Sequence, residues 1–416
     1  MTQENSNPAG PRKTSLHGAH VAAGGVMVNF GGWEMPLWYP GGAVKEHMAV
    51  LTGAGLFDTS HMSTVMARGA GIREFLNYAV TRDISGLKAG RSGYGAILDA
   101  AGQALDDCII YPLSEDRFAL VVNAGMGEKI VDHMRALPGG DAFAWDDLTA
   151  KVAKIDIQGP ESFAVLRRCL ARPEAVFASF PYFSFQGDFD FPDGGLTLAD
   201  GTPALVSRTG YTGELGFEIF VPADKAAALW EMLLAAGKYV PVVPCGLAAR
   251  DSLRAGAVLA LSHQDIGNWP FINHPWSFAL PLAQDGSFTK SFHGAAALDA
   301  GRADHTLVFA GYDPRKVAHD EARVVYRGEE IGTVLTCVAD MSLGRLEERI
   351  IGLNSPDQPD GWRPKGLVCG FIKVNTHLEP GTAVALRDSR REIPVTICTD
   401  LRPGRTARRA LPAPTK

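Results

Sequence analysis

RTGYTGELGFE, residues 208–218, is the stretch that decides how this sequence is read, together with PCGLAARDSLR, residues 244–254. Three glycines in the first stretch allow the backbone to turn tightly. Tyr211 and Glu218, with Arg250 from the second stretch, supply an aromatic ring, a carboxylate and a guanidinium that could hold a planar polar heterocycle. The pair of stretches therefore predicts a small-molecule site, although spacing alone is equally compatible with an ordinary loop.

Length and composition restrict the possible classes of protein. A chain of 416 residues is too long for one ordinary core, so we expect about three domains. Hydrophobic residues at 46% and charged residues at 21% are typical of a globular protein. The net charge of −6 offers no broad attraction to nucleic acid or to anionic lipid. No run of about eighteen apolar residues occurs, which argues against a membrane-spanning helix.

Cysteine spacing and the first residues of the chain point to a cytoplasmic protein. The six cysteines show neither a C-x-x-C step nor a cysteine–histidine cluster, so we expect free thiols and no metal site. Residues 1–12 are polar and lack the features of a secretory signal. P-loop, G-x-G-x-x-G, G-x-S-x-G and H-E-x-x-H motifs are also missing, which removes the commonest nucleotide, esterase and zinc-protease interpretations.

An internal repeat is visible at an offset of 90 residues. Residues 64–69 and 154–159 are alternating segments that end in glycine and continue into an amphipathic helical pattern. Two related α+β modules are therefore predicted, although strand, glycine turn and helix is also a common local unit. Helices are expected over 126–137 and from about 223 to a left-handed cap at Gly237.

Beyond residue 300 the pattern changes to short strands and turns. Segments 322–326, 330–336, 383–387 and 394–397 read as strands, and residues 354–361 read as a loop. Such spacing predicts a small all-β sandwich or barrel. In the first module, residues 96–99 and 104–111 flank a hairpin turn, and Phe118, Leu120 and Val122 alternate in a further strand.

Asp106 and Asp107 interrupt an otherwise apolar strand. Alternation places only one of the two side chains on the inner face, so one aspartate should point into a site. A strand start beside a hairpin turn explains the pair equally well. Asn123, at the end of the next strand, could cap the following helix or donate hydrogen bonds to a ligand.

The remaining candidates each have two interpretations. Tyr94 and Tyr211 lie in glycine-rich turns, where either ring could face a planar ligand or pack in the core. Glu218 faces away from its apolar neighbours, toward either solvent or a cleft. Arg250 begins a predicted helix and could pair with Asp251 or Glu214, or bind a ligand carboxylate.

A series of further motifs gives these residues a context. The chain contains FGGWEMP at 30–36, Glu46-His47, GLFDTSHM at 55–62, Leu105-Asp106-Asp107 and Val121-Val122-Asn123, followed by YTGE at 211–214 and GLAARDSLR at 246–254. In these motifs, over about the first 256 residues, the chain closely resembles the aminomethyltransferase (T-protein) family of the glycine cleavage system and its folate-dependent relatives. So many motifs in the family's order make a chance match very improbable.

The resemblance implies a three-domain α+β fold around a central folate cavity, with two related antiparallel α+β domains and a C-terminal jelly-roll-like β-barrel domain. Residues 1–58 and 147–255 would form the first domain. Residues 59–146 and 256–300 would form the second, and residues 301–416 the barrel.

The resemblance also implies a site and a reaction. Asp107 would be the catalytic carboxylate, and tetrahydrofolate, a co-substrate, would be held by Tyr94, Asn123, Tyr211, Glu218 and Arg250. An aminomethyl group on the lipoyl arm of a carrier, the H-protein, would donate its methylene to folate, with release of ammonia and no metal. The H-protein would be a transient partner. Glu214 is expected to be structural.

Departures from the family's pattern begin after Arg254. Residues 259–263 replace a Leu-Tyr-Gly step, residues 268–278 carry an unusual segment that bears two tryptophans and a histidine, and a longer insertion follows residue 341. Because these regions would border the entrance, the one-carbon donor stays open. A folate-dependent demethylase of a small methylated compound is one alternative, and a folate-binding protein without turnover is another.

Overall fold

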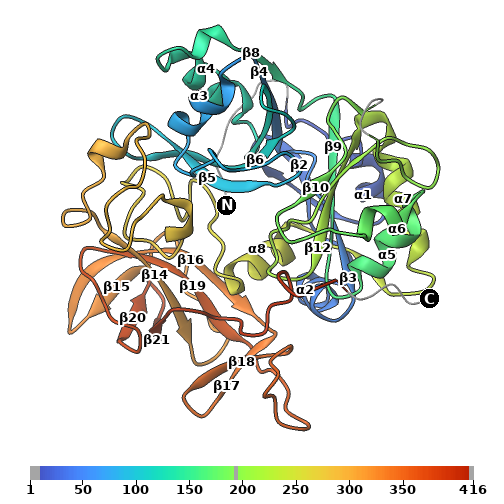
Figure 1. Ribbon diagram of the computed structural model, residues 1–416. Helices are drawn as coiled ribbons and strands as arrows, with labels where there is room; N and C mark the ends of the chain where they lie inside the picture. Colours follow the sequence, from blue (N-terminus) through green and yellow to red (C-terminus); the bar gives the residue numbers. More distant parts are fainter. Residues whose placement is uncertain (1–9, 192–194, 412–416) are drawn as a thin grey trace.

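The computed structural model describes residues 10–191 and 195–411, and its strands form three large sheets in three lobes around a central region (Figure 1). The chain begins with helix α1 (His17–Ala22), an antiparallel hairpin of β1 (Val26–Phe30) and β2 (Trp33–Trp38), and helix α2 (Ala43–Thr52). Within the described ranges, no helix is long and apolar enough to cross a membrane.

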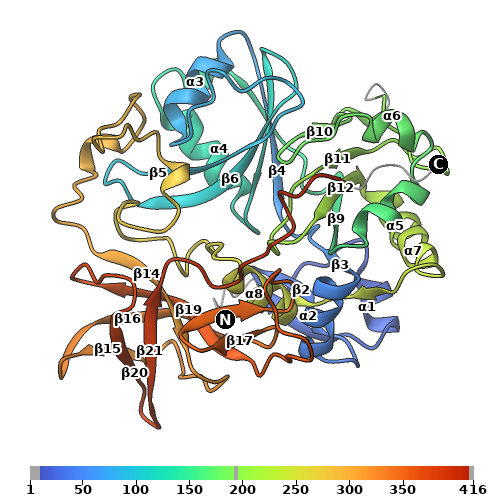
Figure 2. The ribbon, with the colours of Figure 1, turned by 60° about the horizontal axis from the view of Figure 1, so that its bottom comes forward.

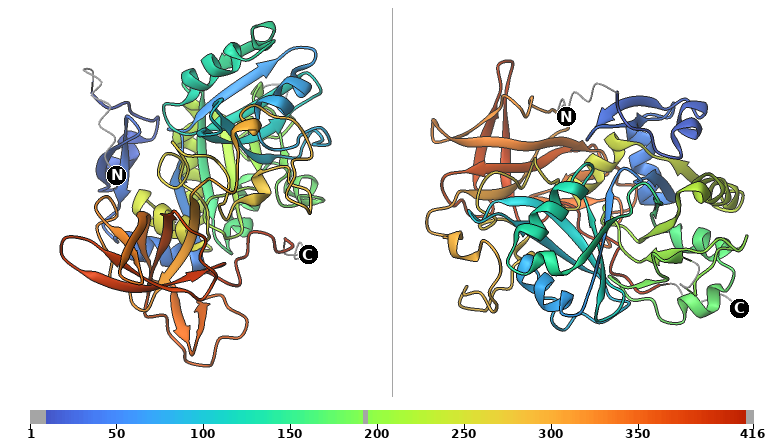
Figure 3. Two further views of the ribbon diagram at one scale, coloured as in Figure 1. Left: turned by 90° about the vertical axis from the view of Figure 1, so that its left-hand side faces the viewer. Right: turned by 90° about the horizontal axis from the view of Figure 1, so that it is seen from above.

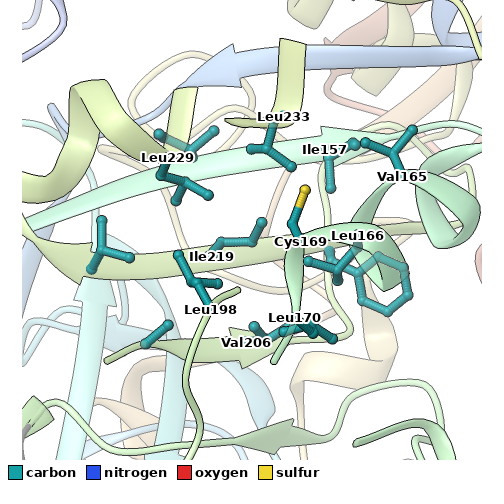
Figure 4. Close-up of a cluster of buried hydrophobic side chains, with 14 of the residues drawn as sticks. Ile157, Val165, Leu166, Cys169, Leu170, Leu198, Val206, Ile219, Leu229 and Leu233 are labelled. Carbon is teal, nitrogen blue, oxygen red and sulfur yellow. The ribbon is translucent and has the colours of Figure 1, made fainter. Parts of the chain in front are cut away.

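A six-stranded sheet has the order β10-β11-β12-β9-β3-β13. Its strands are β3 (Ala54–Asp58), β9 (Val152–Gln158), β10 (Phe185–Gln186), β11 (Leu205–Ser207), β12 (Gly216–Pro222) and β13 (Val242–Pro244). Only β13 and β3 pair in parallel among them; the other neighbours are antiparallel. Helices α5 (Ser162–Cys169) and α7 (Ala226–Ala236) contribute Leu166, Leu229 and Leu233 to the core over this sheet (Figure 4). A short helix, α6 (Pro173–Phe177), lies in the same lobe.

The helix expected from residue 223 begins with a 3₁₀ turn, Ala223–Lys225, and continues as α7. The predicted left-handed cap at Gly237 is wrong, because this glycine has φ −63° and stays in the right-handed region. Its N–H donates to the Leu234 carbonyl at 3.0 Å. A Cβ at Gly237 would lie 2.8 Å from that carbonyl oxygen, so close packing rather than a positive φ accounts for the glycine.

A five-stranded antiparallel sheet has the order β5-β6-β7-β4-β8. Its strands are β4 (Ser63–Arg68), β5 (Gly93–Leu98), β6 (Ala104–Pro112), β7 (Arg117–Val122) and β8 (Ala144–Asp147), and α3 (Ile72–Ala79) and α4 (Gly127–Ala136) lie in the same lobe. The predicted repeat is present. β4 and β9 are each paired on both sides, both lead through a glycine with positive φ (Gly69 and Gly159), and α3 and α5 begin and end 90 residues apart.

The C-terminal strands close into a six-stranded barrel of order β14-β19-β16-β15-β20-β21. Its strands are β14 (His305–Gly311), β15 (Arg323–Tyr326), β16 (Glu329–Asp340), β19 (Leu367–Val374), β20 (Ala383–Arg387) and β21 (Glu392–Cys398). The predicted barrel and mixed α+β class are thereby confirmed. A separate hairpin, β17 (Leu343–Leu346) and β18 (Arg349–Gly352), precedes the expected loop at 354–361.

Two barrel strands, β14 and β19, are absent from the sequence prediction. β19 lies within the segment read as an insertion after residue 341, yet it pairs with both β14 and β16. Seven of its eight residues are buried, so it lacks the alternation of a half-buried strand. The predicted domain boundaries themselves stay a prediction.

The lobes meet at helix α8 (Leu247–Gly256), in the centre of Figure 1. The segment that follows, with 3₁₀ turns at Ser277–Ala279 and Ala295–Ala297, joins the five-stranded sheet to the barrel through a shared core that includes Leu98, Trp276 and Phe371. After β21 the chain returns toward the six-stranded sheet (Figure 2), where Ala407 N–H donates to Gly213 O at 3.1 Å. Figure 3 shows from two further sides that the barrel, in orange and red, forms a separate lobe.

Candidate functional site

A central cavity of about 1410 Å³ is lined by residues of all three lobes and of the segment that connects them. The structure brings every site residue predicted from the sequence to the wall of this cavity: Tyr94, Asp107, Asn123, Tyr211, Glu218 and Arg250. These residues come from five places in the chain: β5, β6, the end of β7, the stretch 211–218 and α8. The cavity is therefore the candidate functional site.

Strand β6 resolves the question of which aspartate faces the site. Its burial alternates along residues 104–109, with Asp106 fully buried and Asp107 on the cavity face. The antiparallel partner of Ile109 is Tyr94, so Tyr94 lies on the same face as Asp107. Tyr94 donates its hydroxyl hydrogen to Asp107 Oδ2 over 2.9 Å. Alternation alone thus places one carboxylate in the cavity and one behind it.

Asn123 holds both carboxylates. Its side-chain Nδ2 donates to Asp107 Oδ1 at 2.7 Å and to Asp106 Oδ1 at 2.7 Å, and its backbone N–H donates to Asp106 Oδ2 at 2.8 Å. The position of Asn123 directly after β7, the neighbour of β6, explains this reach. Asn123 therefore orients the carboxylate pair, and its two amide hydrogens are already used within the protein.

The two carboxylates have raised pKa values for related reasons. Burial raises the pKa of Asp107 to about 7, and the charge of Asp106 adds to this shift. Burial also raises the pKa of Asp106, to about 6, although the hydrogen bonds from Asn123 lower it. Since the two groups interact, their protons are lost as a pair rather than independently. The site can thus accept or release a proton near neutral pH.

Arg250 and Tyr211 form a second part of the wall. The guanidinium of Arg250 lies over the Tyr211 ring, 4.7 Å from its centroid. Tyr211 donates its hydroxyl hydrogen to the Ala260 carbonyl, which fixes the ring. Arg250 pairs with neither of the partners considered from the sequence. Its Nη1 lies 3.2 Å from Asp156 Oδ2, and Asp251 instead accepts a hydrogen bond from Arg254. Arg250 is thereby held at the cavity rather than at the outer surface.

Glu218 faces the cavity rather than bulk solvent and belongs to a buried charge network. Strand pairing sets Glu218 opposite Asp156, and Lys154 Nζ donates to both carboxylates. Thr209 donates its hydroxyl hydrogen to Glu218 Oε2. With Arg250, which pairs with Asp156, the network contains two cations and two anions. The opposite charges compensate one another where solvent is largely excluded.

Lys154 and Asp156 were missed by the sequence analysis, which used their strand only as evidence of a repeat. The signal was present, because two charged residues alternate in a strand whose other members are apolar or amide-bearing. Close packing against Gln158, at the end of the same strand, explains two glycines of the glycine-rich stretch: a Cβ at Gly210 or Gly216 would collide with the Gln158 side chain. The glycine-rich stretch is thus shaped by its approach to β9.

Other motif residues join segments of the fold. Glu46 accepts hydrogen bonds from Tyr39 N–H at 2.6 Å and from Gly246 N–H at 2.9 Å, so it fixes the entry into α8. Glu214 is buried and accepts the hydroxyl hydrogen of Thr406 at 2.6 Å, as a structural residue would. These contacts keep the cavity wall in place without facing a ligand.

The unusual segment at 268–278 contributes Pro275, Trp276 and Phe278 to the cavity wall. The Phe278 ring lies 5.7 Å from the Tyr94 ring, and its side chain is largely exposed. His61 and His263 also line the cavity and were not selected from the sequence. Burial lowers the pKa of His61 to about 4, so its ring is neutral near pH 7. Residues 10–191 and 195–411 contain no cluster of three or more metal-ligating side chains.

The sequence is similar to those of a known protein family. A family model described as the GCVT N-terminal domain matches residues 16–269. An aminomethyltransferase of Streptomyces coelicolor is 37% identical over 341 residues, which cover 80% of this chain and 87% of that protein. One from Geobacillus kaustophilus is 36% identical over 328 residues, with 78% and 86% covered.

Comparison of folds extends the similarity to the whole molecule. The crystal structure of the glycine cleavage system aminomethyltransferase T from Bartonella henselae superposes with a TM-score of 0.76 at 27% identity. The match covers 96% of this chain and 99% of that one, so it includes the barrel beyond the family-model match.

Proposed function

This chain belongs to the aminomethyltransferase family that carries the GCVT N-terminal domain, and from that membership we propose a specific reaction for its cavity. The protein transfers the methylene group of an aminomethyl-lipoyl carrier protein to tetrahydrofolate, and ammonia is released. Asp107 is the catalytic residue, and Tyr94, Asn123, Tyr211, Glu218 and Arg250 form the folate site.

One observation carries the proposal: Asp107 is held by Tyr94 and Asn123 on the wall of the same cavity that Glu218 and Arg250 line. A proton-accepting group and a set of recognition groups therefore share one enclosed space. Such convergence of perturbed carboxylates and polar groups is typical of an active site.

The residues present fit a reduced folate. Each carboxylate oxygen can accept two hydrogen bonds, and Glu218 Oε1 accepts one from Lys154, so acceptor capacity remains for the amino edge of a pterin. Tyr211 and the glycine-rich turn offer a flat surface to a planar ring. Arg250 offers N–H donors and positive charge beside that surface. This donor and acceptor set matches a heterocycle that carries both N–H groups and an acidic tail.

The proposed reaction takes place in two steps. The lone pair of a folate nitrogen forms a bond to the methylene carbon, the carbon–amine bond breaks, and the amine leaves as ammonia with one proton. The second folate nitrogen then closes on the same carbon, the carbon–sulfur bond breaks, and the lipoyl sulfur takes the second proton. Both protons come from the two folate nitrogens, so no oxidant or metal takes part. Asp107 accepts the first proton and holds folate in position.

The partner that follows from this reaction is a lipoylated H-protein. Its arm would have to reach Asp107 inside the cavity, whose wall includes residues 257–264 and the exposed Phe278. A brief contact between the two proteins is enough for a protein-borne donor, because the reacting carbon is at the tip of a long flexible arm. The carrier is therefore expected to bind transiently.

The test supplies purified protein and tetrahydrofolate with aminomethylated H-protein, and in parallel with methylated amines, sulfonium compounds and aryl methyl ethers. The proposal expects ammonia and methylenetetrahydrofolate from the carrier alone. Turnover of a small methylated donor without carrier would favour a demethylase instead. Folate binding without any turnover would favour a non-catalytic folate-binding protein.

A further inference from the structure

His263 lies on the cavity wall beside the carboxylate pair. Its Nε2 is 3.9 Å from Asp106 Oδ1, and its side chain is 33% exposed. It belongs to the segment in which the sequence departs from the family's pattern. The imidazole thus lines the same cavity as Asp107 and lies near Asp106, the carboxylate that shares the Asn123 amide with Asp107.

The turn that carries His263 is rigidly held. Asp265 accepts hydrogen bonds from Leu261 N–H at 2.9 Å, from Thr336 Oγ1 at 2.7 Å and from the guanidinium of Arg254. Thr336 belongs to barrel strand β16, and Arg254 belongs to α8. Two other elements therefore hold the turn at Asp265, and the position of His263 is set by the fold rather than by a mobile loop.

The backbone of His263 is in a region that favours glycine. Its φ is +63°, which is uncommon for residues with a Cβ and costs about 1 kcal/mol. Glycine adopts this conformation without that cost. A strained residue on the wall of an active-site cavity is a candidate for a functional role, since strain is retained where the side chain is useful.

The imidazole is in a state to accept a proton. Burial lowers the pKa of His263, the charge of Asp107 raises it, and Lys129 on α4 lowers it. Asp106 and Asp107 are the acidic groups that face it from β6, and Lys129 is the basic group that faces it from α4. The net direction is downward, so the ring is mainly neutral near pH 7 and can take up and pass on a proton.

The proposed function needs such a group, because one proton must travel from the folate nitrogen to the departing amine. We propose that His263 is a second catalytic residue, which receives this proton from the interacting Asp106–Asp107 pair, whose Asp106 Oδ1 lies 3.9 Å from its Nε2, and delivers it to the amine as the carbon–nitrogen bond breaks. His263 and the carboxylate pair both return to their starting protonation states when ammonia has left. This inference rests on the proposed function, since it assigns a proton path to that reaction.

Two substitutions separate this role from a structural one. His263→Gly removes the imidazole and relieves the backbone, and His263→Asn keeps a polar side chain that tolerates positive φ but cannot titrate. His377→Asn, at an exposed histidine on the barrel, is the matched control. For each protein we would measure kcat for ammonia release against pH, equilibrium binding of tetrahydrofolate, melting temperature and the effect of added imidazole.

Both His263 variants should lose about 100-fold in kcat, a typical contribution of general acid–base catalysis. Tetrahydrofolate binding should stay within about twofold, since general acid–base catalysis acts on the transition state rather than on bound substrate. His263→Gly should melt at or above the wild-type temperature, and added imidazole should restore part of its rate. His377→Asn should match the wild type.

A wild-type kcat and pH profile in His263→Gly would overturn the inference and leave the proposed function intact. Loss of kcat that imidazole does not restore, together with a lowered melting temperature, would also overturn it and assign a structural role. If the wild-type protein releases no ammonia from the carrier, the proposed function fails and this inference fails with it.

Discussion

Asn123 Nδ2 lies 2.7 Å from Asp107 Oδ1 and so donates a hydrogen bond to the carboxylate that we assign to catalysis. The same amide also bonds the neighbouring carboxylate, Asp106. A hydrogen bond to the charged form of a carboxylate lowers its pKa, and this effect opposes the burial that raises the pKa of both groups. Asn123 therefore keeps Asp107 ionisable in a site that would otherwise favour the neutral acid.

Substitution of Asn123 by alanine should move the pH dependence of the reaction. Loss of the donor raises the pKa of Asp107 further, so the acid limb of the kcat profile should shift to higher pH. At pH 7 the rate should fall about tenfold, because ionised Asp107 becomes scarce and is less well oriented. Steady-state kinetics from pH 5.5 to 9 measure both effects. An unchanged acid limb would show that Asn123 does not control the protonation of Asp107.

Asp107→Asn should stabilise the folded protein, and the gain should grow with pH. The pKa of Asp107 is raised in the folded state, to about 7. Between about pH 4, where an unfolded aspartate titrates, and pH 7 the folded state holds more protons than the unfolded state, so wild-type stability falls as pH rises. Asparagine does not titrate, so the variant does not lose this stability. We expect the difference in the free energy of unfolding to reach about 1–3 kcal/mol at pH 8.

Urea unfolding at pH 5 and pH 8 measures this difference between Asp107→Asn and the wild type. We expect little difference at pH 5 and a higher unfolding midpoint for the variant at pH 8. A variant that is less stable than the wild type at pH 8 would contradict the raised pKa. The prediction implies that the catalytic carboxylate lowers stability for the sake of activity.

The buried charge network of Lys154, Asp156, Glu218 and Arg250 gives a third prediction. Lys154→Met leaves Glu218 buried without its cation, while Asp156 keeps Arg250. Removal of one partner of a buried ion pair costs about 3–5 kcal/mol. The double variant Lys154→Met/Glu218→Gln removes both charges and should recover more than half of that loss. Denaturant unfolding of Lys154→Met, Glu218→Gln and the double variant gives a double-mutant cycle for this ion pair. If the stability losses of the two single variants simply add in the double variant, Lys154 and Glu218 are not energetically coupled.

The C-terminal segment gives a fourth prediction. Arg402 is fully buried and donates to the carbonyls of Thr212 and Leu253, which belong to the glycine-rich stretch and to α8. Arg402→Ala removes this donor to the Thr212 carbonyl and takes the buried guanidinium away from Glu214 and Asp340, so we expect a loss of about 3 kcal/mol in stability. Tetrahydrofolate affinity should also fall, because Tyr211 lies in the same turn. Arg408→Ala, at an exposed arginine of the same segment, is the control for stability.

Periodicity and glycine placement predicted much of the fold, since they report local structure. The 90-residue repeat fixed the equivalence of α3 and α5 before any contact was known. β19 was not predicted because a strand buried on both faces shows no alternation of apolar and polar residues. The error at Gly237 arose because glycine serves close packing as well as positive φ, and only the neighbouring chain distinguishes the two.

The sequence predicted those site residues that belong to recognisable motifs. Asp107 and Tyr94 lie on the paired strands β6 and β5, and Asn123 directly follows β7. The resemblance selected all three residues, whereas alternation left open which aspartate faces the site. The prediction that Tyr94 lies in a turn is wrong, because the residue belongs to β5. Lys154 and His263 were missed for different reasons. The role of Lys154 depends on a strand register to Glu218 across 64 residues, and that of His263 depends on a turn fixed by Thr336 of the barrel. No local pattern encodes either relationship.

The most direct test of the central claim is a single-turnover measurement of ammonia release. Enzyme saturated with tetrahydrofolate is mixed with a smaller amount of aminomethylated H-protein, for the wild type and for Asp107→Asn. We predict one ammonia per carrier with the wild type, and a rate at least about 100-fold lower with Asp107→Asn although folate remains bound. An equal rate in the two proteins, or no ammonia from the wild type, would contradict the assignment of this cavity as the folate-dependent active site.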